Sequence, residues 1–292
     1  MSDKKQANER GITSVASYLE AIRYRETALD ASAKVNNTIP EEEKSTMKFF
    51  YRGHASAEWQ LIPSLFRTIP GVDHGLEIVN GINGSYFPEE QYLIQESERI
   101  FPELFASCKN DVSRMAVAQH HGIPTRLLDV SGDALVALYF ATQKCIDEGK
   151  ERDGRVFVFR ASAHDYKMAS TGGRIDTIRI GRYHPGQGLL EQGPLEGVDH
   201  PLLVFPPFET SRQKAQDGAF YLFQNKGDDV LHFKEKYYRV VTVPSSAKEA
   251  IRQDLESMLN VHRGTLFPEM LESYADKLKD DAGRRIRAEM QI

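Results

Sequence analysis

Apolar residues near the start of the chain recur at helical spacing. The positions are Val15, Tyr18, Leu19 and Ile22, which stand at i, i+3, i+4 and i+7. Ser14 precedes them and is placed to cap the helix that they predict. Similar patterns predict helices over residues 89–101, 111–121, 132–145 and 246–259, and a last helix from Pro268.

Shorter runs of aromatic and β-branched residues predict strands. They lie at residues 47–54, 155–160, 202–205, 219–224 and 239–243. Helices early and late in the chain, with strands between them, are typical of the α+β class. We therefore expect a single α+β domain with a central mixed or antiparallel sheet flanked by helices.

One predicted helix has no polar face. Its central part, 134–141, is apolar on nearly every side, so we expect it to be buried as the support of the fold. Ser131 is expected to cap this helix, with Asp133 in its first turn. Ser246 and Glu249 have the spacing of a capping box for the later helix.

The polar segments suggest the domain organisation. Residues 1–13 form a polar N-terminal leader and 281–292 a charged C-terminal tail, and we expect one domain over 14–280. Within it, residues 161–200 are rich in glycine and polar side chains, which predicts a long loop insertion.

The composition narrows the class of protein. Of the 292 residues, 40% are hydrophobic and 27% charged, which argues against a disordered or fibrous chain. A net charge of -5 argues against a broad nucleic-acid footprint. Two cysteines are too few for a disulfide framework or a cysteine zinc site. No stretch approaches the roughly 18 apolar residues of a membrane span. We expect a soluble, cytoplasmic protein without a membrane partner.

A first group of candidate residues follows the strand at 47–54. Arg52 stands near its end, where the planar donors of a guanidinium suit a phosphate or pyrophosphate group. Gly53 would let a ligand approach the backbone. The alternative is that Arg52 makes a structural ion pair and that Gly53 only forms a turn. Trp59 is interpreted as a core residue rather than a platform for a base.

A second group fills the segment between two apolar helices. Its polar members are Gln119, His120, His121, Thr125, Arg126, Asp129 and Ser131. A buried polar group without a partner costs about 1–3 kcal/mol, so this density predicts either an internal network or a ligand site. Asp129 could stabilise a developing positive charge, or could pair with Arg126 across a turn. His120 is a candidate acid or base near neutral pH.

The sequence lacks the motifs of several familiar kinds of site. His120 and His121 point about 100° apart on a helix, so they do not predict a metal site. The chain has no Gly-x-Ser-x-Gly elbow, no Gly-rich phosphate loop ending in Lys-Ser or Lys-Thr, and no dinucleotide Gly-x-Gly-x-x-Gly fingerprint. A weaker polar cluster at 212–220 leads into a strand, and on residue types alone it could be a turn.

These segments together resemble the FRG domain family, which is named for a Phe/Tyr-Arg-Gly motif. That motif is Tyr51-Arg52-Gly53 here, and the resemblance continues at residues 59–67, 119–129, 137–141, 216–220 and 266–268. The order of the motifs is in turn similar to an ADP-ribosyltransferase-like fold. A strand-end arginine comes first, then a polar strand that leads into an Ala-rich helix, and then a polar residue before a late strand.

The resemblance implies roles in binding and cleaving NAD. Arg52 would contact the phosphates or ribose, and Tyr51 and Tyr139 would line the nicotinamide pocket. The second motif would be supplied by Thr125, Arg126, Asp129 and Ser131. Gln216, with Asp217 beside it, stands where such transferases usually place a glutamate, so the reaction could differ.

The expected function is therefore that of an NAD-dependent ADP-ribosyltransferase-like enzyme or NAD glycohydrolase. The resemblance suggests a toxin or defence effector, with NAD as substrate, a protein or nucleic acid as acceptor, and no metal. The alternative is a non-catalytic module that binds a nucleotide or nucleic acid.

Overall fold

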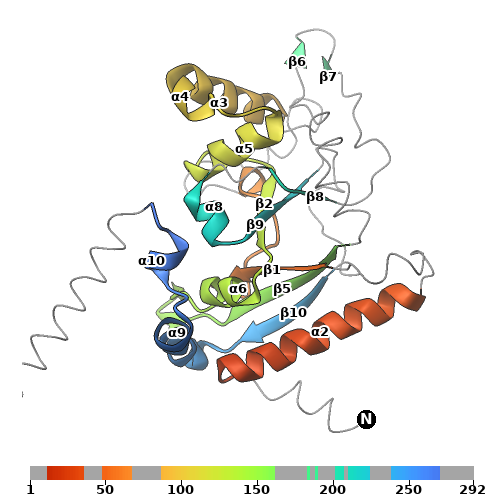
Figure 1. Ribbon diagram of the computed structural model, residues 1–292, viewed down its shortest axis with the longest axis vertical. Coiled ribbons are helices and arrows are strands. Elements are labelled where there is room, and N and C mark those ends of the chain that lie inside the picture. The colour runs from red at the N-terminus through yellow and green to blue at the C-terminus, as the bar shows by residue number, and fades with distance from the viewer. Residues whose placement is uncertain are drawn as a thin grey trace, which may run out of the picture.

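The computed structural model describes residues 12–35, 48–67, 87–161, 183–184, 188–189, 201–206, 210–223 and 238–269 (Figure 1). Its helices are α2 (Val15–Val35), α3 (Phe87–Ile100), α4 (Pro102–Phe105), α5 (Asp111–His120), α6 (Ala134–Ala141), α8 (Ser211–Ala215), α9 (Ser245–Leu259) and α10 (Arg263–Leu266), with a 3-10 turn η2 (Ser64–Phe66). The tail at 281–292, nearly all of the leader at 1–13 and most of the insertion at 161–200 lie outside the described residues.

The strands form one principal sheet and two short ladders. The principal strands are β1 (Lys48–His54), β2 (Leu127–Ser131), β5 (Gly154–Ala161), β8 (Leu202–Val204), β9 (Gly218–Leu222) and β10 (Tyr238–Val243). The two-stranded ladders are β3 (Ile146–Asp147) with β4 (Lys150–Glu151), and β6 (Tyr183–His184) with β7 (Gly188–Leu189). The second ladder shows that the predicted insertion is not loop throughout.

The principal sheet has the order β10-β5-β1-β2-β9-β8, and its described pairings are all antiparallel. The predicted α+β class and antiparallel sheet are confirmed. β1 pairs with β5, and β2 with β9, along their whole lengths, whereas β1 and β2 share only the described pair Tyr51↔Ser131. The sheet therefore consists of two three-stranded halves that diverge from this pair. Figure 1 shows β10, β5 and β1 lying beneath β2, β9 and β8.

Helices cover the two halves separately. A first hydrophobic cluster joins α2, α6 and α9 to β10, β5 and β1. A second hydrophobic cluster lies under η2, on the opposite face of the principal sheet. A third hydrophobic cluster packs α3 and α5 against β8 and β9. Within the described residues, no helix is long and apolar enough to cross a membrane.

The buried helix α6 lies directly on the backbones of β1 and β5. A Cβ atom at Gly53 would stand 1.9 Å from the carbonyl oxygen of Ala137, and one at Gly154 would stand 2.0 Å from that of Ala141. The helix is thus central to the fold, as predicted. The missing side chain at Gly53 makes room for α6. The same residue also lines the cavity described below, so its expected contact with a ligand stays a prediction.

Replacing Gly53 with alanine is expected to destabilise the protein by about 2–3 kcal/mol, because the new methyl group forces α6 away from β1. Urea denaturation followed by circular dichroism measures this change. Gly149→Ala is the control: that glycine has a φ of +75° but open space around it, so only the backbone cost of about 1 kcal/mol applies. Equal costs for the two variants would contradict the close packing.

Several local predictions were wrong. Asp133 caps α6, its side chain accepting from the backbone N–H of Leu135 at 2.7 Å, whereas Ser131 ends β2. α9 begins after Pro244 without a side-chain cap, so the predicted capping box at 246–249 does not form. Trp59 is 52% exposed in the turn after β1 and is not a core residue.

The first helix extends beyond its expected end, whereas the last expected helix falls almost entirely outside the described residues. Residues 31–45, with an Asn-Asn pair, Pro40 and a run of glutamates, have the composition of a loop, but α2 continues five residues into this segment, to Val35. Pro268 lies in a turn, and a helix that continues from it would fall outside the described residues.

Candidate functional site

A cavity of about 240 Å³ lies where the two halves of the sheet diverge. Its walls come from β1, α5, β2, α6, α8 and β9. The predicted site residues that line it are Tyr51, Arg52, Gly53, His120, Asp129, Ser131 and Gln216. Segments far apart in sequence thus converge on one hollow.

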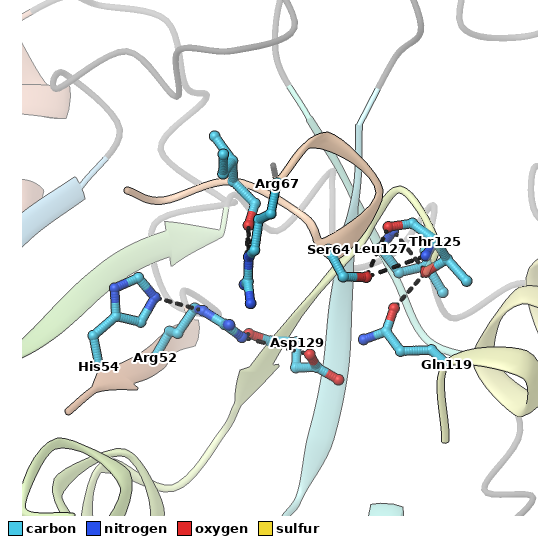
Figure 2. A network of polar contacts seen from close by, with 9 residues as sticks. Arg52, His54, Ser64, Arg67, Gln119, Thr125, Leu127 and Asp129 are labelled. Carbon is cyan, nitrogen blue, oxygen red and sulfur yellow. Dashed lines mark hydrogen bonds and ion pairs between the residues drawn. The ribbon is translucent and has the colours of Figure 1, made fainter. Parts of the chain in front are cut away.

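Arg52 and Asp129 meet across the opening between β1 and β2 (Figure 2). Nη1 of Arg52 donates to the backbone carbonyl of Asp129 at 2.6 Å and lies 3.5 Å from its Oδ2 atom. The Arg52 side chain is 15% exposed and that of Asp129 is 60% exposed. Burial lowers the pKa of Arg52 and the nearby carboxylate opposes this, so a guanidinium stays charged next to a solvent-reachable anion.

His54 holds Arg52 from the other side. Nε of Arg52 donates to Nε2 of His54 at 3.0 Å, which requires that ring nitrogen to be unprotonated. Burial and, next, the charge of Arg52 lower the pKa of His54 to about 3. We had not assigned His54 a role, although the two-residue period of a strand places it on the same face as Arg52.

His120 enters the cavity from the end of α5. Its Nε2 atom lies 3.6 Å from Oε1 of Glu269, which follows α10. Burial lowers the pKa of His120, while the Glu269 carboxylate acts in the opposite direction. A neutral imidazole is therefore available as a base near neutral pH. Glu269 was not predicted, although it directly follows the Leu266-Phe267-Pro268 motif.

The turn before α6 is tied to the turn before β9. The Ser131 hydroxyl donates to the carbonyl of Gln216 at 2.7 Å, and the Gly132 N–H donates to that of Asp217 at 2.9 Å. The amide nitrogen of Gln216 donates to the carbonyl of Leu266 at 3.0 Å. The predicted second and third motifs thus form one hydrogen-bonded unit.

Three predicted site residues are not among the described residues that line the cavity: Thr125, Arg126 and Tyr139. Arg126 is fully buried and pairs with Glu90 of α3, its Nε lying 3.0 Å from Oε2, so the alternative pair between Arg126 and Asp129 is wrong. Tyr139 is buried on another side of α6, one position from Phe140, which does line the cavity. Adjacent helical positions point about 100° apart, which explains the difference.

Thr125 acts on the cavity through Gln119. Its hydroxyl accepts from the N–H of Leu127 at 3.2 Å and donates to the side-chain oxygen of Gln119. The amide nitrogen of Gln119 is thereby turned toward Asp129, as Figure 2 shows. Gln119 lines the cavity and adds a neutral donor to it.

Within the described part of the chain, no group of three or more His, Cys, Asp or Glu residues is placed to hold a metal ion. The cavity offers two guanidinium groups, those of Arg52 and Arg212, together with the Asp129 carboxylate, the His120 imidazole and amides. Such a set suits a ligand with both anionic and hydrogen-bonding parts.

The fold and the cavity define an α+β protein with a polar site between the halves of a split sheet. Residues 47–150, which carry both Arg52 and Asp129, match the family model of the FRG domain. The predicted FRG domain is thus confirmed over these residues. Comparisons with curated proteins and with solved structures found no significant match. The predicted bounds, 14–280, extend beyond the matched residues and stay a prediction.

Proposed function

We propose that the protein is an NAD-dependent ADP-ribosyltransferase-like enzyme that cleaves the bond between nicotinamide and ribose. The observation that carries this proposal is the meeting of Arg52 and Asp129, 77 residues apart in sequence, at one cavity. The cationic group suits the phosphates of NAD, and the exposed carboxylate suits a positive charge that develops on the ribose.

The placement of the motifs supports the same proposal. Arg52 lies on β1, Ser131 ends β2 and precedes α6, and Gln216 stands just before β9. The three strands are neighbours in the order β1-β2-β9, so the motifs meet as the family resemblance implies.

The proposed reaction breaks the bond between the anomeric carbon and the pyridinium nitrogen. Both electrons of that bond leave with nicotinamide, which becomes neutral, and the ribose acquires oxocarbenium character. Asp129 stabilises this charge, and Arg52 holds the phosphates. The hydroxyl oxygen of the acceptor attacks the anomeric carbon, and its proton passes to neutral His120. The acceptor is water, a protein or a nucleic acid.

One observation favours a second candidate, a non-catalytic module that binds a nucleotide or nucleic acid. Gln216 replaces the glutamate usual in such transferases, and its amide is engaged with the carbonyl of Leu266. Such a module would use the same cavity and leave the ligand unchanged.

Nicotinamide release from NAD separates the two candidates. We expect Arg52→Ala and Asp129→Asn each to lower the rate by about 100-fold, because each removes one group that stabilises the transition state. Arg99→Ala and Asp147→Asn, which alter exposed ion pairs outside the cavity, are matched controls and should retain the wild-type rate. Binding of NAD without release would favour the module. If NAD produced neither nicotinamide release nor a thermal shift, that result would contradict the proposed enzyme.

A cytoplasmic location and a role as a toxin or defence effector remain part of this proposal. The location is supported by the low cysteine content, since a chain with two cysteines suits a reducing compartment. The effector role rests on the family resemblance alone.

A further inference from the structure

We propose that Arg67 and Arg52 together form a binding site for the pyrophosphate group of a dinucleotide, at the edge of the cavity beside Asp129. The identification of the dinucleotide rests on the proposed function. The anion site itself rests on the position of the two guanidinium groups. Arg67 was not assigned a role from the sequence.

The guanidinium of Arg67 is held in place by the backbone. Its Nε and Nη2 atoms donate to the carbonyl oxygen of Ile62 at 3.2 Å and 3.1 Å. With two donors bound to one oxygen, the planar group has little freedom to rotate. Figure 2 shows that it points toward Arg52 and Asp129. The remaining nitrogen, Nη1, is not bound to Ile62. Arg67 is not among the residues that line the cavity, but Asp129, which does line it, is close enough to act on the charge of Arg67.

The turn that carries Arg67 is itself anchored. Leu65 and Phe66 of η2 are buried in the hydrophobic cluster beneath it. The backbone N–H of Leu65 donates to the carbonyl of Thr125 at 3.1 Å, and the N–H of Thr125 donates to the Ser64 hydroxyl at 3.2 Å. Arg67 therefore stands on a turn fixed to the segment that enters β2. A preorganised donor of this kind loses little freedom when it binds an anion.

The local charges do not balance. Arg52 and Arg67 carry two positive charges, and His54 is neutral because burial and both arginines oppose its protonation. Asp129 is the carboxylate within ion-pair distance of Arg52, and no described carboxylate forms an ion pair with Arg67. Counting these described residues alone, the cluster has a net charge of about +1, and each arginine disfavours the other electrostatically. A bound anion would offset that repulsion.

The chemistry of the two side chains selects the anion. A guanidinium binds phosphate oxygens through two parallel N–H donors, and a pyrophosphate offers oxygens on two linked phosphorus atoms. Two guanidiniums at one opening can therefore share a single pyrophosphate. Since Arg67 is exposed, a ligand can reach this edge from solvent.

The test is isothermal titration calorimetry with inorganic pyrophosphate and with ADP-ribose. We expect Arg67→Gln to weaken the binding of each by about tenfold, as is typical for the loss of one charge-assisted contact. Asp129→Asn should strengthen pyrophosphate binding several-fold, because it removes the competing carboxylate. The wild-type affinity should fall as salt rises. Nicotinamide riboside, which lacks phosphate, should bind wild type and Arg67→Gln equally.

Arg99→Gln is the matched control, since it removes a guanidinium from an exposed ion pair on α3. Arg67→Lys gives a second variant. A lysine ammonium lacks the planar, forked donors with which a guanidinium can bind the Ile62 carbonyl and a ligand at the same time, so this variant should recover only part of the affinity.

Unchanged binding of ADP-ribose by Arg67→Gln would overturn the anion site, even if nicotinamide release persisted. Absence of pyrophosphate binding by the wild type would also overturn it. Weakened pyrophosphate binding by Arg67→Gln, without any nicotinamide release by the wild type, would support the site and contradict only the enzyme.

Discussion

Replacing Glu90 with glutamine is expected to lower the free energy of unfolding by about 3–5 kcal/mol. Glu90 and Arg126 are 0% and 1% exposed, and their charged atoms lie 3.0 Å apart. The other oxygen of Glu90 accepts from the backbone N–H of Arg126 at 3.0 Å. The substitution leaves a buried guanidinium without the charge of Glu90, which costs far more than an ordinary surface ion pair.

Urea denaturation measures the effect, with Glu96→Gln as the control. Glu96 pairs with Arg99 on the exposed side of the same helix, where solvent screens the pair, so its replacement should change stability little. A double variant, Glu90→Leu with Arg126→Met, should recover much of the lost stability, because neither charge then remains in the core. A cost for Glu90→Gln as small as that of Glu96→Gln would show that the pair is not important for stability.

Acidification is expected to remove stability through His54. The pKa of His54 is about 3 in the folded protein and about 6.5 in an unfolded chain, so the folded state binds fewer protons between these values. The contribution of the neutral ring is complete above about pH 6.5 and is lost as pH falls toward 3. At about 1.4 kcal/mol per pH unit, a drop from pH 6.5 to 4.5 costs about 3 kcal/mol from this residue.

His54→Gln isolates that contribution from other groups that titrate. Its side-chain oxygen can still accept from Nε of Arg52, but it takes up no proton. Denaturant melts of both proteins at pH 7 and pH 4.5 should show a loss about 3 kcal/mol smaller in the variant. Equal losses in the two proteins would mean that His54 is not held neutral in the fold.

Periodicity predicted the fold because it reflects which faces are buried. The helices around Tyr18 and Val136 and the strands around Tyr51 and Phe157 all lie within about two residues of their predicted positions at one end or both. Helix ends were less predictable. Ser131 could serve as a cap or as the last residue of a strand, and its bond to Gln216, distant in the chain, decides between the two.

The candidate site was predictable in part for the same reason. Asp129 and Ser131 share one face of β2, so a site that includes one includes the other. Arg126 lies just before that strand and turns to a carboxylate 36 residues earlier, a partner that no local pattern indicates. Glu269 and Arg67 reach the site through tertiary packing. Arg67 ends the 59–67 run of the family resemblance and Glu269 follows the 266–268 motif, but neither motif indicates which partner its residue contacts.

Because β1 and β2 share the single pair Tyr51↔Ser131, the width of the opening between these strands can vary. A continuous hydrogen-bonded ladder would keep β1 and β2 about 4.8 Å apart along their length. Beyond this pair, the distance between them depends on side chains such as Arg52 and Asp129. Substitutions at the rim can therefore widen or narrow the entrance without disturbing strand pairing.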